Sequence, residues 1–216
     1  YHDMQDLEFT IQKGRLWMLQ TRTGKRNGAA AIRIAMDMMD EGLISEDEAL
    51  LRISPENIDE IMHDTIDPKS EKSAQLLGTG LPAGPGSATG QIVFTAEDAE
   101  KWTKKGEKVI LVRNETSPED VHGMHVANGI LTAKGGMTSH AALVARGWGK
   151  CCIVGCSAIN INFEKKSVDI GNNSLHEGDW VTLNGSLGYI YKDELSLKKP
   201  NLDKNQYFNR LMDLAD

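Results

Sequence analysis

Short apolar runs recur between residues 91 and 191, and stretches with helical periodicity separate them. Runs of this length, rich in β-branched residues and flanked by glycine, are typical of buried strands. The expected strands are 91–95, 108–112, 129–132, 152–154, 180–183 and 188–191, and the expected helices are 96–105, 118–127 and 138–147. Strands and helices that alternate on this scale predict a compact α/β domain.

The domain boundaries follow from shifts in composition. Residues 77–90 are crowded with glycine, proline, serine and threonine, which form turns, so a new domain is expected to open there. We assign this domain to residues 77–196. Residues 25–76 are assigned to a helical segment and a linker, and residues 197–216 to a further linker helix that leads to another domain.

The first 24 residues predict an isolated hairpin. Apolar and polar residues alternate over 7–12, Lys13-Gly14 supplies a turn, and a second apolar stretch returns the chain. A two-stranded ribbon is only marginally stable by itself, so the hairpin is expected to end a larger sheet. The chain starts at Tyr1 without a signal-peptide pattern, so we expect a processed chain or a piece of a longer protein.

The segment after the hairpin is expected to be helical. Apolar residues recur every three or four positions over 31–39, which indicates an amphipathic helix that ends at Gly42. Ser45 and Glu48 form a capping-box pattern, and Ser54-Pro55 is a cap followed by proline at the first helical position. The methionine-rich stripe of the first helix is either ordinary core or a partner-binding face, and we favour core.

Charge and cysteine content exclude several classes of protein. The 216 residues carry 24 Lys and Arg against 31 Asp and Glu, a net charge of −7, which argues against nucleic-acid binding. No apolar run approaches the roughly 18 residues that a membrane-spanning helix needs. The three cysteines lie within six positions (Cys151, Cys152 and Cys156), which is no disulfide framework and favours a reducing compartment.

The most informative stretch reads Leu-Thr-Ala-Lys-Gly-Gly-Met-Thr-Ser-His-Ala-Ala-Leu-Val-Ala-Arg-Gly-Trp-Gly at residues 131–149. Gly135 and Gly136 let the backbone after a strand turn its N–H groups into one hollow, which favours an anion. Thr138 and Ser139 stand at a helix N-terminus, where hydroxyl and amide donors suit phosphoryl oxygens. His140 in the first turn feels the positive end of the helix, which favours the neutral, nucleophilic imidazole.

The residues alone leave the role of His140 open. A histidine at a helix start is more often a cap or a surface residue, and Gly-Gly before a helix is a common turn. Spacing therefore indicates an anion site with a candidate histidine nucleophile, and no more.

The same stretch resembles the phosphohistidine signature of the PEP-utilising enzymes. This family includes pyruvate, phosphate dikinase, phosphoenolpyruvate synthase and Enzyme I of the sugar phosphotransferase system. Met137 and the pair Cys151-Cys152 select the dikinase type, since the other two usually have Arg and an Ile-Pro-Ala-type run there. Leu-Pro-Ala-Gly-Pro-Gly at 81–86 and Arg-Asn-Glu-Thr-Ser-Pro-Glu-Asp at 113–120 resemble the start and a loop of the same domain.

The resemblance implies a swivelling β/β/α phosphohistidine domain, preceded by the end of an ATP-grasp nucleotide domain. His140 then takes a pyrophosphoryl group from ATP, loses its terminal phosphoryl to inorganic phosphate, and passes the remaining phosphoryl to pyruvate. Glu8 and Gln20 match magnesium-binding positions of the nucleotide domain, and Arg22 matches a phosphate-contacting one. From the residues alone, a charge pair on the surface of the hairpin is the favoured explanation. ATP, phosphate and pyruvate or PEP would meet this chain through other domains, so the fragment alone is not expected to turn over.

The resemblance also has implications for the regulation, the oligomeric state and the cellular location of the protein. In plant members of the family the threonine that matches Thr138 is phosphorylated, which implies a regulatory kinase and phosphatase. It further implies that the full enzyme uses Mg²⁺ and a monovalent cation and forms a homodimer. The protein is expected in the cytoplasm or in an organelle such as the chloroplast or glycosome, and it is not expected to be secreted. The alternatives are the same domain of a phosphoenolpyruvate synthase or related phosphotransferase, and an inert regulatory or binding module.

Overall fold

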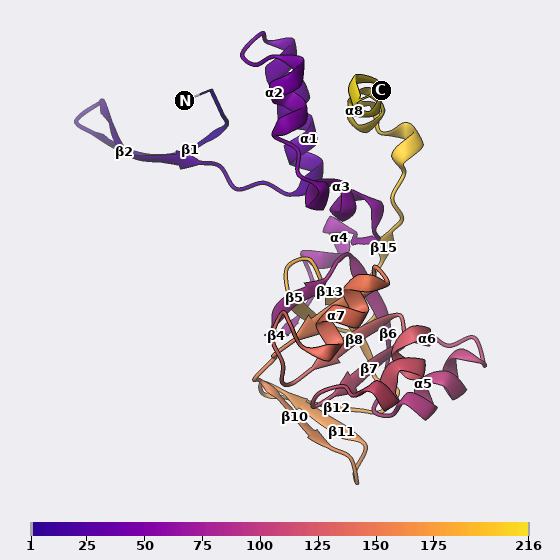
Figure 1. Cartoon of the computed structure of the whole chain (residues 1–216). Helices are drawn as coiled ribbons and strands as arrows, with labels where there is room; N and C mark the ends of the chain where they lie inside the picture. Colours follow the sequence, from indigo (N-terminus) through magenta and orange to yellow (C-terminus); the bar gives the residue numbers. More distant parts are fainter. Residues whose placement is uncertain (1, 216) are drawn as a thin grey trace. The chain divides into compact units, whose positions relative to one another are not determined.

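The computed structural model describes residues 2–215 and divides into two compact units. One unit consists of residues 1–62 together with 201–216, and the other of residues 63–200 (Figure 1). Among the described residues, no helix has the length and apolar character needed to cross a bilayer.

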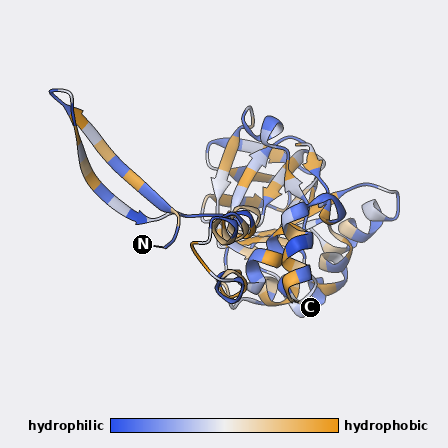
Figure 2. Cartoon of the chain, turned by 90° about the horizontal axis from the view of Figure 1, so that it is seen from above, coloured by the Kyte–Doolittle hydropathy of each residue, from blue (hydrophilic) through white to orange (hydrophobic). Residues whose placement is uncertain are grey.

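The first unit begins with the expected hairpin. Strands β1 (Gln5–Gln12) and β2 (Arg15–Thr23) pair antiparallel, and both turn residues, Lys13 and Gly14, have positive φ angles of 50° and 72°. Positive φ at both positions is the geometry of the type I′ turn that suits hairpins. Hydrophobic and hydrophilic residues alternate along the ribbon (Figure 2), yet Phe9 keeps 56% of its surface exposed. A two-stranded ribbon buries little apolar surface, so this face needs cover from elsewhere.

The first unit contains helices in each stretch where helical periodicity or a capping pattern predicts one. They are α1 (Gly28–Asp40), α2 (Glu46–Leu51), α3 (Pro55–Met62) and α8 (Gln206–Ala215), the last preceded by a 3-10 turn, η2 (Leu202–Lys204). Ser45 and Glu48 make the reciprocal capping box. Met36 and Met38 are buried in one cluster with Leu211 of α8, which confirms the core interpretation of the methionine stripe.

The second unit is built on an eight-stranded mixed sheet in the order β4-β14-β13-β6-β7-β8-β9-β5. The central strands β6 to β9 run parallel, and the outer strands pair antiparallel. The strands are β4 (Leu76–Thr79), β5 (Leu81–Gly84), β6 (Ser87–Val93), β7 (Val109–Arg113), β8 (Gly129–Thr132), β9 (Cys151–Val154), β13 (Trp180–Asn184) and β14 (Tyr189–Lys192).

Two apolar clusters cover the two faces of this sheet. On one face, helices α5 (Ala96–Thr103), α6 (Val121–Val126) and α7 (His140–Gly147) pack through small residues such as Ala99 and Ala142. On the other face lies a three-stranded sheet of β10 (Ile159–Asn162), β11 (Ser167–Ile170) and β12 (Asn173–His176), which contributes Val168 and Ile170. The layers are therefore β/β/α, as the resemblance implies.

This second sheet is the largest feature that the sequence pattern misses. Ile159, Ile161 and Phe163 alternate with polar residues, as do Val168 and Ile170, but each alternation is only three to five residues long and no continuous apolar run marks it. The strands are antiparallel and half-exposed, so only alternate residues enter the core.

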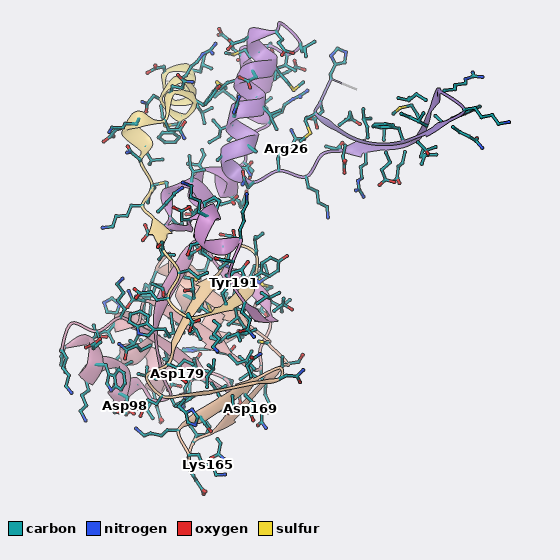
Figure 3. The ribbon with its side chains drawn as sticks, turned by 180° about the vertical axis from the view of Figure 1, so that it is seen from behind. Arg26, Asp98, Lys165, Asp169, Asp179 and Tyr191 are labelled. Atoms are coloured by element: carbon teal, nitrogen blue, oxygen red, sulfur yellow. The ribbon has the colours of Figure 1, made fainter. Side chains whose placement is uncertain are left out.

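The second unit also extends beyond the expected domain of residues 77–196. Strand β3 (Thr65–Ile66) pairs with β15 (Leu197–Lys198), and the short helix α4 (Pro68–Glu71) follows β3. The hydroxyl of Tyr191, labelled in Figure 3, donates to the carboxylate of Glu71 at 2.7 Å. The polar residues around 67–73, expected to act as a linker, are therefore tied to the sheet by pairing that short-range pattern cannot reveal.

The buried cysteines lead to a prediction on reactivity. Cys151 and Cys152 on β9 are buried, and burial raises the pKa of the Cys151 thiol to about 12. We expect the native chain to react with Ellman's reagent at pH 8 at least about 100 times more slowly than the urea-unfolded chain, because thiolates are the reactive species. Unfolded thiols ionise near pH 8.5, so the stability contributed by the neutral buried thiols falls as the pH rises above that value. Rapid labelling of either thiol in the folded chain would contradict this burial.

Candidate functional site

His140 is the first residue of α7, directly after a loop that follows β8. Ser139 is the N-cap, with φ −67° and ψ 159°, and its hydroxyl accepts the N–H of Ala142 at 3.4 Å. Ala141 and Ala142 are buried, which lets the start of the helix lie against the sheet. The predicted order of strand, glycine loop and capped helix is confirmed.

The glycine loop has a backbone that side chains would disrupt. Gly135 has a φ of 106°, and an added Cβ would lie 3.0 Å from the Ser139 hydroxyl. Gly155 has a φ of 65°, and an added Cβ there would lie 2.6 Å from the carbonyl oxygen of Gly135. Gly136 has open space around it. Two chain segments thus approach closely beneath the loop that leads to His140, and only glycine permits that approach.

A second loop fixes the His140 ring. The hydroxyl of Thr116, in the loop after β7, lies 3.1 Å from His140 Nδ1. If Nδ1 carries the proton and donates it to this hydroxyl, the lone pair of the neutral ring is on Nε2. The ring is half-buried. The Thr116 hydroxyl is also able to donate to an unprotonated Nδ1, so the contact places this hydroxyl at Nδ1 and the tautomer decides which nitrogen holds the lone pair.

The loop that carries Thr116 was not given a site role from the sequence. Its ends bind one buried carboxylate, since Ser117 N–H donates to Asp120 at 2.9 Å and Arg113 lies 3.2 Å from it. Ser117-Pro118 followed by Asp120 is a capping pattern visible in the sequence, but the distant contact to His140 is not.

The loop directly before His140 is exposed at Met137 and Thr138. Met137 is 41% exposed, and its backbone carbonyl accepts a hydrogen bond from Arg146 Nη2 at 3.2 Å. Ser139 N–H donates to the Gly136 carbonyl at 2.9 Å, so this amide is used within the turn rather than by a ligand.

The expected nucleotide-binding residues lie on the hairpin of the first unit. Glu8 and Gln20 are directly opposite one another in the ribbon, beside a β-bulge. Arg22 lies 2.9 Å from Asp6 and 3.7 Å from Glu8. Asp6, which sequence reasoning missed, is thus the nearer partner of Arg22. Within residues 2–215, no cluster of three or more His, Cys, Asp or Glu side chains could hold a metal.

The chain is similar to known proteins both in its second unit and over nearly its whole length. Residues 105–188, which include the glycine loop and His140, match the family model described as PEP-utilising enzyme, mobile domain. The chain is 56% identical over 202 residues to pyruvate, phosphate dikinase 2 of Zea mays, which covers 94% of this chain and 23% of that protein.

Two further relatives give the same result. The chain is 50% identical over 216 residues to pyruvate, phosphate dikinase of Clostridium symbiosum, covering 100% of this chain and 24% of the relative. It is 53% identical over 205 residues to the chloroplastic pyruvate, phosphate dikinase of Flaveria pringlei, covering 95% of this chain and 21% of the relative. The chain spans about a quarter of the length of these relatives. Residues 105–188 therefore match the mobile domain of the PEP-utilising enzymes, and the chain over nearly its whole length is similar to the pyruvate, phosphate dikinases.

Proposed function

We propose that this chain is the phosphohistidine carrier of a pyruvate, phosphate dikinase. In the reaction, ATP, pyruvate and inorganic phosphate become AMP, phosphoenolpyruvate and pyrophosphate. The observation that carries the proposal is the contact between Thr116 and Nδ1 of His140 at the head of α7. With the proton of the neutral ring on Nδ1, Nε2 would hold the lone pair that attacks phosphorus.

The chemistry at His140 runs in three steps. Nε2 attacks the β-phosphorus of ATP, the P–N bond forms, and the bond to the α-phosphate oxygen breaks to release AMP. An oxygen of inorganic phosphate then attacks the terminal phosphorus, the bond from that phosphorus to the bridging oxygen breaks, pyrophosphate leaves, and one phosphoryl group stays on Nε2. The enolate oxygen of pyruvate takes the remaining phosphoryl, and the Nε2 lone pair returns. Covalent catalysis divides one difficult transfer into easier ones.

The loop residues would stabilise the transferred group. Backbone N–H groups around Gly135 and Gly136, and the hydroxyls of Thr138 and Ser139, are donors next to the nucleophile. The positive end of α7 adds to their effect. A phosphoryl on Nε2 does not occupy Nδ1, so the Thr116 hydroxyl would stay bonded to Nδ1, as acceptor when Nδ1 is protonated and as donor when it is not.

The hairpin residues fit a role with the nucleotide. Glu8 offers a carboxylate and Gln20 an amide oxygen at opposite positions of the ribbon, which are the ligands that Mg²⁺ prefers. Mg²⁺ would neutralise charge on the phosphates, and Arg22 would add a bidentate donor for a phosphate. We also propose a monovalent cation in the full enzyme.

The whole enzyme would place the other substrate sites on domains outside this chain. We propose that it is a homodimer and acts in the cytoplasm or in an organelle such as the chloroplast or glycosome. Several of the similar plant dikinases are chloroplastic by name.

The carrier function is tested by phosphorylation of the full chain. Incubation with ³²P-labelled phosphoenolpyruvate and a separately prepared PEP-binding domain of a related dikinase should give acid-labile phosphate on the chain. The chain alone should not convert ATP and pyruvate. Absence of acid-labile label would contradict the proposal.

Thr138 is proposed as a regulatory phosphorylation site for a kinase and phosphatase pair. A dianion two residues before the nucleophile would repel an incoming phosphate donor. Thr138→Asp is therefore expected to slow labelling of His140 about tenfold, because its negative charge lies beside the transferred phosphoryl. Thr138→Asn, the neutral isostere, is the control and should retain most of the rate. Equal rates for the two variants would overturn the electrostatic account.

A further inference from the structure

The loop 114–117 carries Thr116, which contacts His140, although half of its residues are exposed. It must hold the Thr116 hydroxyl within hydrogen-bond distance of His140 Nδ1, while Asn114 and Glu115 beside it are exposed. Exposed loops move more than the elements they connect. Something must therefore fix the loop if Thr116 is to keep one ring orientation of His140.

The two ends of the loop are joined through Asp120. This carboxylate is 5% exposed and accepts from the Ser117 N–H at 2.9 Å and from the Ser117 hydroxyl at 3.3 Å. Its other oxygen lies 3.2 Å from an Arg113 guanidinium nitrogen. Arg113 ends β7, and Ser117 directly follows Thr116. One buried carboxylate thus closes the loop that carries Thr116.

Arg113 is itself anchored to the body of the unit. Its Nη1 donates to the carbonyl of Phe94 at 3.1 Å, and its guanidinium lies 5.7 Å from the ring centre of Phe163. The backbone at the loop start is also held, since the N–H of Lys134 donates to the carbonyl of Asn114 at 2.8 Å. Arg113 therefore connects the loop to the residue after β6 and to the β10–β11 turn, and Asn114 connects it to the residue before the glycine loop.

Stability alone is a poor explanation for this arrangement. A buried ion pair usually loses in desolvation about what it gains in attraction, so it is weak evidence of stabilisation. What it does supply is geometry, because charge-assisted bonds are short and directional. Here the ion pair fixes the position of the Thr116 hydroxyl, which lies at His140 Nδ1.

We propose that Arg113 and Asp120 are positioning residues that hold Thr116 against His140 Nδ1. In the proposed arrangement the Thr116 hydroxyl accepts the proton of Nδ1, and the lone pair of the neutral ring lies on Nε2. This inference rests on the proposed function for its purpose, but the tautomer is a property of the unphosphorylated chain.

The test is the tautomer ratio of His140, measured by long-range ¹H–¹⁵N correlation spectra of the full chain. The His140 signals are those that disappear in His140→Gln. Wild type is expected to be mainly the Nδ1–H form. Asp120→Asn keeps the shape but presents an NH₂ group to Arg113, so the loop is released at one end. We expect the ratio of Nδ1–H to Nε2–H to fall about fivefold, equivalent to the loss of one net hydrogen bond.

Three further variants separate positioning from a general structural effect. Thr116→Val should lower the ratio at least as much as Asp120→Asn, and Thr116→Ser should restore it. Asp98→Asn is the matched control, because Asp98 also binds a cation, Lys166 at 3.3 Å, in the same unit. Its tautomer ratio should equal that of wild type.

The outcomes distinguish this inference from the carrier function. An unchanged ratio in Asp120→Asn would overturn the clamp, even if His140 is phosphorylated normally. A shifted ratio supports the clamp, even in a chain that never takes up phosphate. If Asp120→Asn fails to fold, Ser117→Ala removes one contact to the carboxylate and keeps the ion pair, and it should shift the ratio in the same direction; no shift there would overturn the clamp.

Discussion

Replacement of His140 by alanine is expected to abolish the uptake of acid-labile phosphate by this chain. The side chain supplies the nucleophile, and removal of a covalent nucleophile typically costs a factor of about a thousand or more. The fold should survive, because the ring is half-buried at a helix start and α7 is held by its alanines rather than by the histidine. The measurement is transfer of ³²P from phosphoenolpyruvate in the presence of the PEP-binding domain.

The matched control for this variant is His125→Ala. His125 is an exposed histidine of the same unit, on α6, and its ring packs edge-on against Trp148. Its removal should leave the labelling rate within about twofold, because the ring does not contribute to the glycine loop. Equal labelling of His140→Ala and wild type would show that another residue takes up the phosphate.

Gly155→Ala is expected to destabilise the second unit by about 2–4 kcal/mol, from left-handed backbone strain and overpacking. Gly155 has a φ of 65°, and an added Cβ would lie 2.6 Å from the Gly135 carbonyl oxygen. The backbone contact leaves no flexible side chain to move aside, so the glycine loop itself must shift. Urea unfolding should show a lower midpoint, and labelling of His140 should fall in the folded fraction.

Gly136→Ala is the control in the same loop. A Cβ at Gly136 meets nothing within 4 Å, and its φ is outside the left-handed region. The urea midpoint of this variant should stay close to that of wild type. A similar loss of stability in both variants would mean that the loop tolerates no side chain anywhere, and that the approach of Gly155 to Gly135 is not the cause.

The local parts of the site were predictable from the sequence. Glycines after an apolar run, then Ser139 and His140 before a small-residue helix, give strand, turn and capped helix through backbone conformations and short-range bonds. The capping box at Ser45 and the turn at Lys13-Gly14 formed for the same reason. Each of these depends on residues within a few positions of one another.

The parts that the sequence did not reveal are long-range. Thr116 reaches His140 across 24 positions because β7 and β8 are parallel neighbours, so the loops at their carboxyl ends meet. Pairing of β3 with β15 joins residues more than 120 positions apart. Neither contact can be read from periodicity. Thr116 lies in a loop, and β3 and β15 have two residues each, which is too short for a period to show.

The central claim is that His140 carries the phosphoryl group on Nε2 while Thr116 holds Nδ1. The most direct measurement is the ¹⁵N and ³¹P spectrum of the phosphorylated chain with ¹⁵N-labelled histidine. The account predicts one phosphohistidine, with the phosphorus coupled to Nε2 of His140 and a proton retained on Nδ1. Phosphorus coupled to Nδ1, or phosphate found on a different residue, would contradict it.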